Sequence, residues 1–418
     1  MSVSVVVIGA GMVGHRFTEE LMRHDLERRF EVTMVGAEEH LPYNRILLSD
    51  VLASRAREDA ITLPRTDERV RLLTGVAVTS IDRPGRTVAL GDGSTLAYDV
   101  LVLATGARAN LPPIPGIVES PQVRVLRTLD DCREIATAAT SARAALVLGG
   151  GILGLEAACG LRRRGVPVLV VDLDEHLMAT QLPAGPAEVL HEQLADLDID
   201  VITGSSVAEV ISIEGRLVAA RLTDDSLVVT DLMVVSCGIR AETELAVEAG
   251  LEVERGVVVD SSMATKDPRI FAIGDCAQPP TGMTGLLVPG WRQAEALADG
   301  LIRGVPAEVD VPAAEALKLK AVGADLVRAG SPDADRVITV HDPGGRRHVS
   351  LAVTGERLIG FTCVGAPDLA ASLTLAHERR TPLPVDPLSL LSPAARTEEA
   401  SPLRMPNSTT LCRCNNVS

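Results

Sequence analysis

Three glycines in the first half of the chain have a spacing that could hold a dinucleotide. Gly149, Gly151 and Gly154 follow the short apolar run Ala145–Leu148 in the pattern G-x-G-x-x-G. In a strand–turn–helix unit, the first glycine allows a tight turn and the second lets a pyrophosphate approach the helix N-terminus. The third glycine lets the helix pack close to the strand. This stretch therefore predicts a strand, a glycine turn and a helix.

An aspartate closes the next apolar run. Val168–Val171 predicts a second strand, and Asp172 follows it about 20 residues after the glycines, where a carboxylate can accept hydrogen bonds from an adenosine ribose. A carboxylate also repels a 2′-phosphate, and residues 173–175 include no arginine to receive one. The sequence therefore predicts NADH rather than NADPH as the ligand.

The same glycine pattern occurs at the N-terminus. Residues 3–8 predict a strand, Gly9, Gly11 and Gly14 repeat the spacing, and a helix is expected through Leu21. A single pattern of this kind also occurs where a helix simply crosses a strand. Two copies in the same strand and helix context instead indicate two dinucleotides, most simply FAD and NADH.

The acid that would bind the ribose of FAD is displaced along the sequence. A second strand is predicted at 31–35, and Gly36 stands where the carboxylate would normally close it. Glu38 and Glu39 follow in the loop, and either could bind the ribose. We assign Glu38 to this role.

Further side chains could surround a flavin. Tyr43 could form a wall of the flavin site with its ring, and the Arg45 guanidinium could clamp a phosphate. Thr105 and Gly106 follow the buried run Val100–Leu103, where glycine permits close backbone approach. Trp291 is a second aromatic residue assigned to the flavin, in a chain with one Trp, two Tyr and four Phe.

Asp275 ends a short buried strand predicted at 270–273. A carboxylate there could hydrogen-bond a ribityl hydroxyl, while a helix expected near 292–301 points its N-terminus at the pyrimidine edge of the flavin. The alternative is a strand-end aspartate that caps a helix. The residue alone does not decide between these two roles.

Composition limits the class of protein. A chain of 418 residues suits two or three domains, and 46% hydrophobic with 23% charged residues is typical of a globular enzyme. The net charge of -16 argues against nucleic acid and anionic membranes as partners. No apolar run of about 18 residues predicts a transmembrane helix, and no basic region precedes the first strand. We therefore expect a cytoplasmic protein.

The seven cysteines argue against a redox-active disulfide next to the flavin. None of the first five forms a C-x-x-C or C-x4-C pair. Cys159 and Cys237 lie within or beside apolar runs, where a cysteine usually acts as a small buried hydrophobe.

Several segments together resemble a known family. Residues 9–14, 104–106, 149–156 and 265–275, in this order and spacing, are similar to the pyridine-nucleotide flavoprotein oxidoreductases. Within them, the segments GMVGHRF, PYNRILLS, GGGILGLEAA, GLLVPGWRQAEALADGL and LKLKAVGADL resemble the N-terminal flavoprotein portion of the assimilatory nitrite reductase large subunit.

The resemblance implies an α/β fold with two Rossmann-like dinucleotide-binding domains, the NADH domain being inserted in the FAD domain. The FAD domain would comprise 1–111 and 243–304, and the NADH domain 112–242. A small C-terminal α+β domain at 305–384 would follow, with three antiparallel strands and a helix near 369–377; in similar flavoproteins it covers the flavin and often supports homodimers. Residues 385–418 would be a flexible linker and the start of another segment.

The resemblance also assigns roles to individual residues. Glu156 would lie near the nicotinamide. Relatives in the ferredoxin-reductase branch pair this glutamate with a lysine that directly follows a serine, but here Ser49 is followed by Asp50. The remaining contacts would be to FAD from Gly9, Gly11, Gly14, Glu38, Arg45, Thr105 and Asp275, and to NADH from Gly149, Gly151, Gly154 and Asp172.

Two cysteines near the end of the chain could be metal ligands. Cys412 and Cys414 form a C-x-C pair that resembles the opening of the small 2Fe–2S domain that follows the flavoprotein portion. Such a cluster needs four ligands, and no C-x-x-C follows. The alternative is an exposed cysteine pair on a tail. A 2Fe–2S cluster would form only if the chain continued or if two chains paired to supply four ligands, and of these we expect that the sequence is a piece of a longer protein.

The expected activity follows from the cofactors. Hydride would pass from NADH to FAD, and electrons would then pass to an iron–sulfur or siroheme protein or domain, so no Ser, His or Cys is assigned a catalytic role. Without cysteines for a siroheme and 4Fe–4S centre, the chain alone is not expected to reduce nitrite. Two alternatives remain: a self-sufficient NADH reductase for rubredoxin or ferredoxin, and a non-catalytic NADH-sensing flavoprotein.

Overall fold

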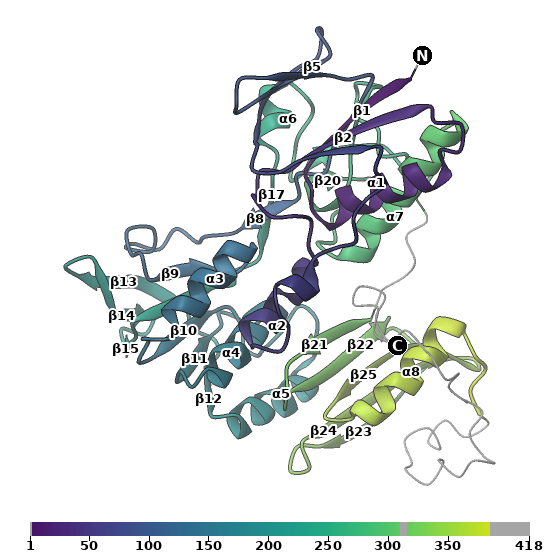
Figure 1. The fold of residues 1–418 in the computed structure, drawn as a ribbon. Helices are drawn as coiled ribbons and strands as arrows, with labels where there is room; N and C mark the ends of the chain where they lie inside the picture. Colours follow the sequence, from purple (N-terminus) through teal and green to yellow (C-terminus); the bar gives the residue numbers. More distant parts are fainter. Residues whose placement is uncertain (1, 310–315, 385–418) are drawn as a thin grey trace. The chain divides into compact units, whose positions relative to one another are not determined.

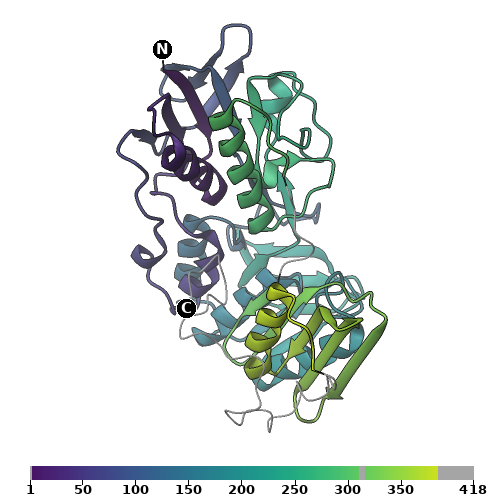
Figure 2. The same cartoon turned by 90° about the vertical axis from the view of Figure 1, so that its right-hand side faces the viewer.

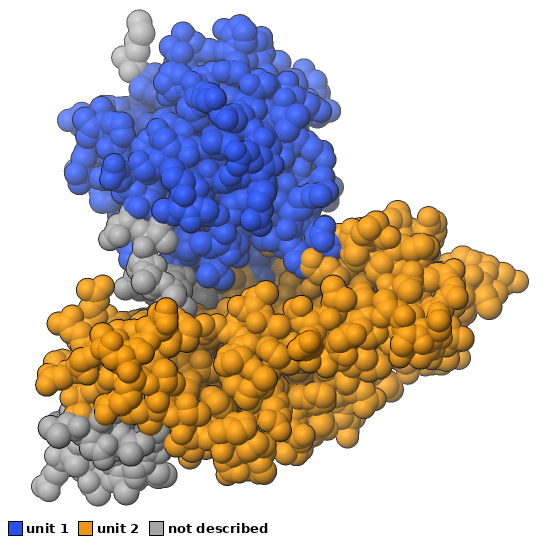
Figure 3. All heavy atoms as spheres, turned by 180° about the vertical axis from the view of Figure 1, so that it is seen from behind, with its two compact units in different colours: residues 1–45, 57–110, 238–311 blue, residues 46–56, 111–237, 312–418 orange. Residues whose placement is uncertain are grey.

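The described residues gather into two compact units. The computed structural model describes residues 2–309 and 316–384 (Figure 1). Unit 1 comprises Met1–Arg45, Arg57–Asn110 and Gly238–Val311, and unit 2 comprises Ile46–Ala56, Leu111–Cys237 and Pro312–Ser418; Figure 3 colours them separately. Residues 46–56 thus belong with the second unit, although they lie within the range predicted for the FAD domain.

Unit 1 is built on a parallel five-stranded sheet. Its strand order is β19-β7-β1-β2-β3. The strands are β1 (Val3–Ile8), β2 (Phe30–Val35), β3 (Val70–Leu73), β7 (Val100–Leu103) and β19 (Ile270–Ala272). Val5, Val6 and Val7 are all buried, as expected for a parallel strand that is covered on both faces. The predicted parallel α/β architecture is confirmed here.

Two helices of unit 1 pack against each other. They are α1 (Met12–His24) and α7 (Leu287–Arg303), and they lie side by side in Figures 1 and 2. The sequence placed the start of α7 five residues too late, because Pro289 and Gly290 within its first turn suggested a loop. The other elements of this unit are η2 (Asp59–Ile61), β4 (Val78–Asp82), β5 (Thr87–Leu90), β6 (Thr95–Ala97), β8 (Ala107–Ala109), β17 (Ile239–Ala241), α6 (Glu244–Glu248), β18 (Val257–Val258), η3 (Gly274–Cys276) and β20 (Ala277–Gln278).

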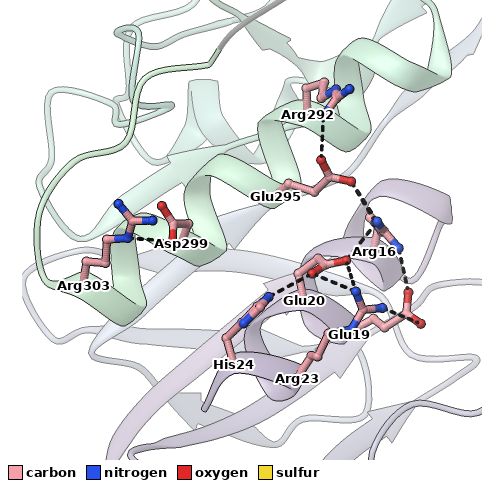
Figure 4. A network of polar contacts seen from close by, with 9 residues as sticks. All are labelled: Arg16, Glu19, Glu20, Arg23, His24, Arg292, Glu295, Asp299 and Arg303. Carbon is pink, nitrogen blue, oxygen red and sulfur yellow. Dashed lines mark hydrogen bonds and ion pairs between the residues drawn. The ribbon is translucent and has the colours of Figure 1, made fainter. Parts of the chain in front are cut away.

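A network of ion pairs joins α1 to α7 (Figure 4). The Arg16 guanidinium lies 2.9 Å from Glu20 on its own helix and 2.8 Å from Glu295 on α7. Surface ion pairs contribute only about 0–1 kcal/mol each. The fully buried Phe17 and Leu21 on α1 therefore contribute more to this packing, and the ion pairs mainly fix how α7 lies on α1.

Unit 2 repeats the parallel arrangement. The strand order is β12-β11-β10-β16-β9, with β9 (Val123–Val125), β10 (Ala145–Leu148), β11 (Val168–Val171), β12 (Ile199–Ile202) and β16 (Leu232–Val235). The strands predicted at 145–148 and 168–171 have these same limits. The unit also contains α2 (Leu48–Leu52), α3 (Leu129–Ala138), α4 (Ile152–Arg163), α5 (Ala184–Asp196), β13 (Val207–Ile213), β14 (Arg216–Leu222) and β15 (Leu227–Val229); η1 (Arg45–Leu47) lies where the two units meet in the sequence.

The end of unit 2 is an antiparallel sheet of five strands rather than the predicted three. Its order is β21-β22-β25-β24-β23, and helix α8 (Pro367–Arg379) packs on β25 and β22. The strands are β21 (Leu317–Lys320), β22 (Asp325–Gly330), β23 (Arg336–Asp342), β24 (Arg347–Thr354) and β25 (Arg357–Val364). Strands β21 and β22 were not predicted, because two lysines and a terminal glycine weaken their strand pattern.

No helix within 2–309 and 316–384 is long and apolar enough to cross a membrane. The longest, α7, has 17 residues and carries charged side chains. The structure therefore offers no membrane-spanning helix in the described part of the chain.

Two histidines face each other in the C-terminal sheet. His341 on β23 is paired in register with His348 on β24, and their Nδ1 atoms are 3.0 Å apart. One nitrogen must donate and the other accept, so both rings cannot carry protons on these atoms. His348 is buried, and burial together with the nearby His341 lowers its pKa to about 4. Folded His348 therefore stays neutral in mildly acidic solution.

We expect this histidine to make the stability depend on pH. Below about pH 6.5 the unfolded chain protonates His348 and the folded chain does not, so stability present at neutral pH is lost as the pH falls towards about 4. Urea unfolding measured at several pH values should show this decline. H348Q should flatten it, whereas H191Q, at an exposed position on α5, should leave it unchanged. An equal pH dependence in wild type and H348Q would contradict the account.

Candidate dinucleotide-binding sites

The glycine turn of unit 1 brings three segments into close approach. A Cβ atom on Gly9 would lie 2.1 Å from the carbonyl oxygen of Ala104, and one on Gly14 would lie 2.2 Å from the carbonyl oxygen of Gly9. Gly9 also has a φ of +115°, which favours glycine. These two glycines are therefore required by the packing of α1 against β1 and the end of β7.

The middle glycine of this turn has a different environment. Gly11 is the N-cap of α1, and no side chain caps the helix there. A Cβ atom at Gly11 would contact one described atom within 4 Å, the Nε of Arg45 at 3.9 Å. The space in front of the helix N-terminus is therefore lined by a guanidinium, which suits a phosphate group.

The glycine turn of unit 2 has the same geometry. A Cβ atom on Gly149 would lie 2.4 Å from the carbonyl oxygen of Ser236, and one on Gly154 would lie 2.0 Å from that of Gly149. At Gly151, the N-cap of α4, no described atom lies within 4 Å of the added Cβ. The packing thus leaves no room for a side chain at the first and third glycines. The second glycine faces open space in which a pyrophosphate could bind.

Asp172 lies beside this turn, at the end of β11. The backbone N–H of Gly150 donates to its carboxylate, and a Cβ atom on Gly150 would lie 2.4 Å from Asp172 Oδ2. Burial raises the pKa of Asp172, and the backbone N–H groups of Gly150, Asp174 and Leu173 oppose that rise. The carboxylate is therefore held next to the glycine turn, where sequence analysis predicted the ribose contact.

The loop after β2 gathers three of the residues predicted for the flavin. The hydroxyl of Tyr43 donates to Glu38 Oε2 at 2.6 Å, and the Arg45 guanidinium donates to Glu38 Oε1. Arg45 also lies over the Tyr43 ring, with 5.2 Å from its Cζ to the ring centroid. A side chain at Gly36 would meet Ala10 at 2.8 Å, so the strand end has no room for a carboxylate. Glu39 is exposed and takes no part in these contacts.

The hydroxyl of Thr105 is used within the protein. It donates to the backbone carbonyl of Glu242 at 2.7 Å and so ties the end of β7 to the segment before α6. Gly106 follows with a φ of +73°. A role of Thr105 and Gly106 in flavin binding stays a prediction.

Asp275 lines a small pocket in unit 1. Other lining residues include Met283, Pro289 and Gln293, and Gln293 Oε1 accepts a hydrogen bond from the backbone N–H of Gly274 at 2.7 Å. The second turn of α7 thus supports the segment that carries Asp275. Gln293 was not predicted as a site residue, because only its position early in a predicted helix hinted at a role.

Trp291 also belongs to the first turns of α7. Its indole Nε1 is buried and has no hydrogen-bond partner among the described residues. The Arg16 guanidinium carbon lies 6.0 Å from the centroid of the ring. The structure does not place Trp291 in the lining of the pocket around Asp275.

Glu156 is buried on α4, and its main partner comes from an element that sequence analysis missed. The backbone N–H of Lys320 on β21 donates to Glu156 Oε1 at 2.9 Å. Burial raises the pKa of Glu156, and the positive charge of Lys320 and the Ser49 hydroxyl oppose that rise. Asp50, at the position where the ferredoxin-reductase branch has a lysine, instead forms an ion pair with Arg55 at 2.5 Å.

No metal site is found within 2–309 and 316–384. That part of the chain has no group of three or more His, Cys, Asp or Glu side chains that could hold an ion, and its five cysteines are free thiols. Burial raises the pKa of the Cys159 thiol to about 12 and that of the Cys237 thiol to about 11. The predicted ligands Cys412 and Cys414 lie outside the described residues.

The chain is similar to known proteins over almost its whole length. It is 34% identical over 430 residues to the large subunit of the NAD(P)H nitrite reductase of Klebsiella oxytoca, a match that covers 99% of this chain and 44% of that protein. It is 33% identical over 425 residues to the assimilatory nitrate reductase electron transfer subunit of Bacillus subtilis, covering 99% and 54%. The chain thus spans about half the length of these curated relatives.

Solved structures and a family model point the same way. A chain in the crystal structure of the covalent putidaredoxin reductase–putidaredoxin complex superposes with a TM-score of 0.81 and 26% identity, covering 94% of this chain and 97% of that one. The model of the pyridine nucleotide-disulphide oxidoreductases matches residues 3–298. The chain therefore belongs to the pyridine nucleotide-disulphide oxidoreductase family, which implies that it is an oxidoreductase that binds FAD and NAD(P)H.

Proposed function

We propose that the chain takes hydride from NADH onto FAD and passes electrons to a metal-centred acceptor, as the module through which electrons enter an assimilatory nitrite reductase. The observation that carries the dinucleotide part is the repeated turn geometry. In both units the first and third glycines are fixed by packing, while the middle one faces space at an uncapped helix N-terminus.

The residues on each turn suggest which dinucleotide each unit holds. In unit 1, Arg45 lies beside Gly11 and would pair with a pyrophosphate, and Glu38 would turn to the ribose of FAD. In unit 2, Gly151 leaves room for the pyrophosphate of NADH and Asp172 would accept its ribose hydroxyls. When bound, FAD and NADH supply the hydride and electron chemistry. The protein supplies position and electrostatics.

The relatives support the choice of acceptor. Both curated relatives reported above are named for nitrite or nitrate reduction, and each aligns with 99% of this chain. In nitrate assimilation the electrons would pass to an iron–sulfur or siroheme domain or protein. The second candidate is a reductase for a separate iron–sulfur protein, favoured by the likeness to the putidaredoxin reductase complex.

The first test is whether NADH reduces the bound flavin. Anaerobic addition of NADH to the FAD-loaded chain should bleach the flavin absorbance as soon as the two solutions are mixed. The reduced chain should then reduce an iron–sulfur or siroheme acceptor domain faster than it reduces rubredoxin or a small ferredoxin. A flavin that stays oxidised in excess NADH would refute the enzyme and favour an NADH-sensing protein. A preference for rubredoxin or ferredoxin would favour the second candidate.

A second test concerns the choice between NADH and NADPH. D172A removes the predicted ribose acceptor and the charge that repels a 2′-phosphate, so kcat/KM for NADH should fall about tenfold, corresponding to a lost hydrogen bond to a charged group. The value for NADPH should fall less or rise. D174A provides the control, because it removes a neighbouring carboxylate. Equal losses with both dinucleotides in D172A would contradict the ribose assignment.

A third test separates the roles of the glycines on α4. G151A should fold with a normal unfolding midpoint, because no described atom lies near the added methyl group, but it should bind NAD+ at least tenfold more weakly. G154A should lower the unfolding midpoint, because its methyl group would lie 2.0 Å from a carbonyl oxygen. Calorimetry and equilibrium binding measure these effects. Normal NAD+ affinity in G151A would rule out the pyrophosphate assignment.

A further inference from the structure

A cluster of charged side chains surrounds the buried Glu156 in unit 2. The elements that meet there are α4, which follows the glycine turn, α2 with the residues just after it, and β21 of the C-terminal sheet. Four charged groups belong to the cluster: Glu156, Asp50, Arg55 and Lys320. Lys320 lies in the segment LKLKAVGADL, to which sequence analysis assigned no role.

Both the backbone and the side chain of Lys320 form hydrogen bonds with neighbouring segments. Its backbone N–H donates to Glu156 Oε1 at 2.9 Å, and its carbonyl accepts from the Arg55 guanidinium. Its ammonium group donates to the backbone carbonyl of Ile46. Three hydrogen bonds thus fix the end of β21 against α4 and the segment around α2, and the side chain of Lys320 is only partly exposed.

The charges in this cluster balance. Asp50 and Arg55 form an ion pair with each other, which leaves Glu156 and Lys320 as the remaining acid and base. A carboxylate as buried as Glu156 needs a compensating charge or it takes up a proton. Burial raises the pKa of Glu156, and the charge of Lys320 is the largest influence that opposes this rise. Burial likewise lowers the pKa of Lys320, and the charge of Glu156 is the largest influence that opposes this fall.

We propose that Lys320 is a positioning residue for NADH: it holds Glu156 as a fixed carboxylate on α4, so that Glu156 can accept a hydrogen bond from the carboxamide of the nicotinamide. The inference rests on the proposed function, since it assumes that α4 binds NADH. It assigns to the C-terminal sheet, which follows the family match in sequence, a direct part in preparing the dinucleotide site.

Other groups around this pair bear on its titration. Ser49 and Asp50 face Glu156 from α2. Cys159, on α4 like Glu156, is influenced by the charges of Glu156 and Arg55. Lys320 is influenced by Glu156, Asp50, Arg55 and Lys318. Loss of the Lys320 charge removes the largest influence that lowers the pKa of Glu156. The carboxyl group would then hold its proton to a higher pH.

The test compares K320M with K318M. Lys318 lies on the same strand but is exposed, so its replacement makes the same change in charge without touching Glu156. Equilibrium titrations measure the affinities for NAD+ and for ADP-ribose, which lacks the nicotinamide. The difference between the two affinities reports the contribution of the nicotinamide to binding. We expect K320M to weaken NAD+ binding about tenfold, the scale of a hydrogen bond to a charged group, and ADP-ribose binding less than twofold.

The pH profile of flavin reduction by NADH gives an independent readout. In K320M the acidic limb should move to higher pH by about one unit, because an opposite charge within a few ångströms shifts a carboxyl pKa by about 1–3 units. K320R should restore most of the wild-type limb. In an E156Q background, K320M should have less than a twofold further effect on NAD+ binding, because the two residues act as one pair.

The outcomes separate the inference from the proposed function. Equal effects of K320M and K318M, or equal losses of NAD+ and ADP-ribose affinity in K320M, would overturn the role of Lys320 while NADH still reduced the wild-type flavin. Additive effects of K320M and E156Q would overturn it as well. A wild-type chain that neither binds NAD+ nor is reduced by NADH would overturn both proposals.

Discussion

The close approach of a helix N-terminus to a parallel strand is the constraint on which the structure depends. In each unit the third glycine of the turn lies where any Cβ atom would collide with the carbonyl oxygen of the first, at 2.2 Å in unit 1 and 2.0 Å in unit 2. This contact fixes where α1 and α4 begin relative to β1 and β10. The contact thereby also sets where the space in front of each helix N-terminus lies.

The two turns show why the same pattern serves packing and binding at once. Gly14 and Gly154 are needed for the fold itself, whereas Gly151 is needed by nothing that the structure describes. A residue that the fold does not require, placed at an uncapped helix N-terminus, is best explained by a ligand. The helix dipole then favours the negative charge of a pyrophosphate at both sites.

Much of this arrangement could be predicted from the sequence, because it is encoded locally. The glycine spacing, the apolar runs at 145–148 and 168–171 and the position of Asp172 all lie within short stretches. Glu38 could be chosen over Glu39 as the expected ribose ligand, but the position of its side chain could not be predicted. Its contacts with Tyr43 and Arg45 depend on how the loop folds back.

Contacts between distant segments could not be predicted. Lys320 is 164 residues from Glu156, and no spacing rule connects them. The strand that carries Lys320 was missed because Lys318 and Lys320 give it a polar pattern. Gln293 could not be predicted either, because no spacing pattern indicates its contact with the backbone of Gly274, 19 residues away.

The central claim is that one chain holds two dinucleotides at separate sites. Isothermal titration of the FAD-loaded chain with NAD+ tests it most directly, with the retained flavin measured before and after. The account predicts one NAD+ bound per chain with no release of FAD, and no competition when FAD is added in excess. Displacement of FAD by NAD+, or binding of either one only when the other is absent, would show a single shared site and contradict the account.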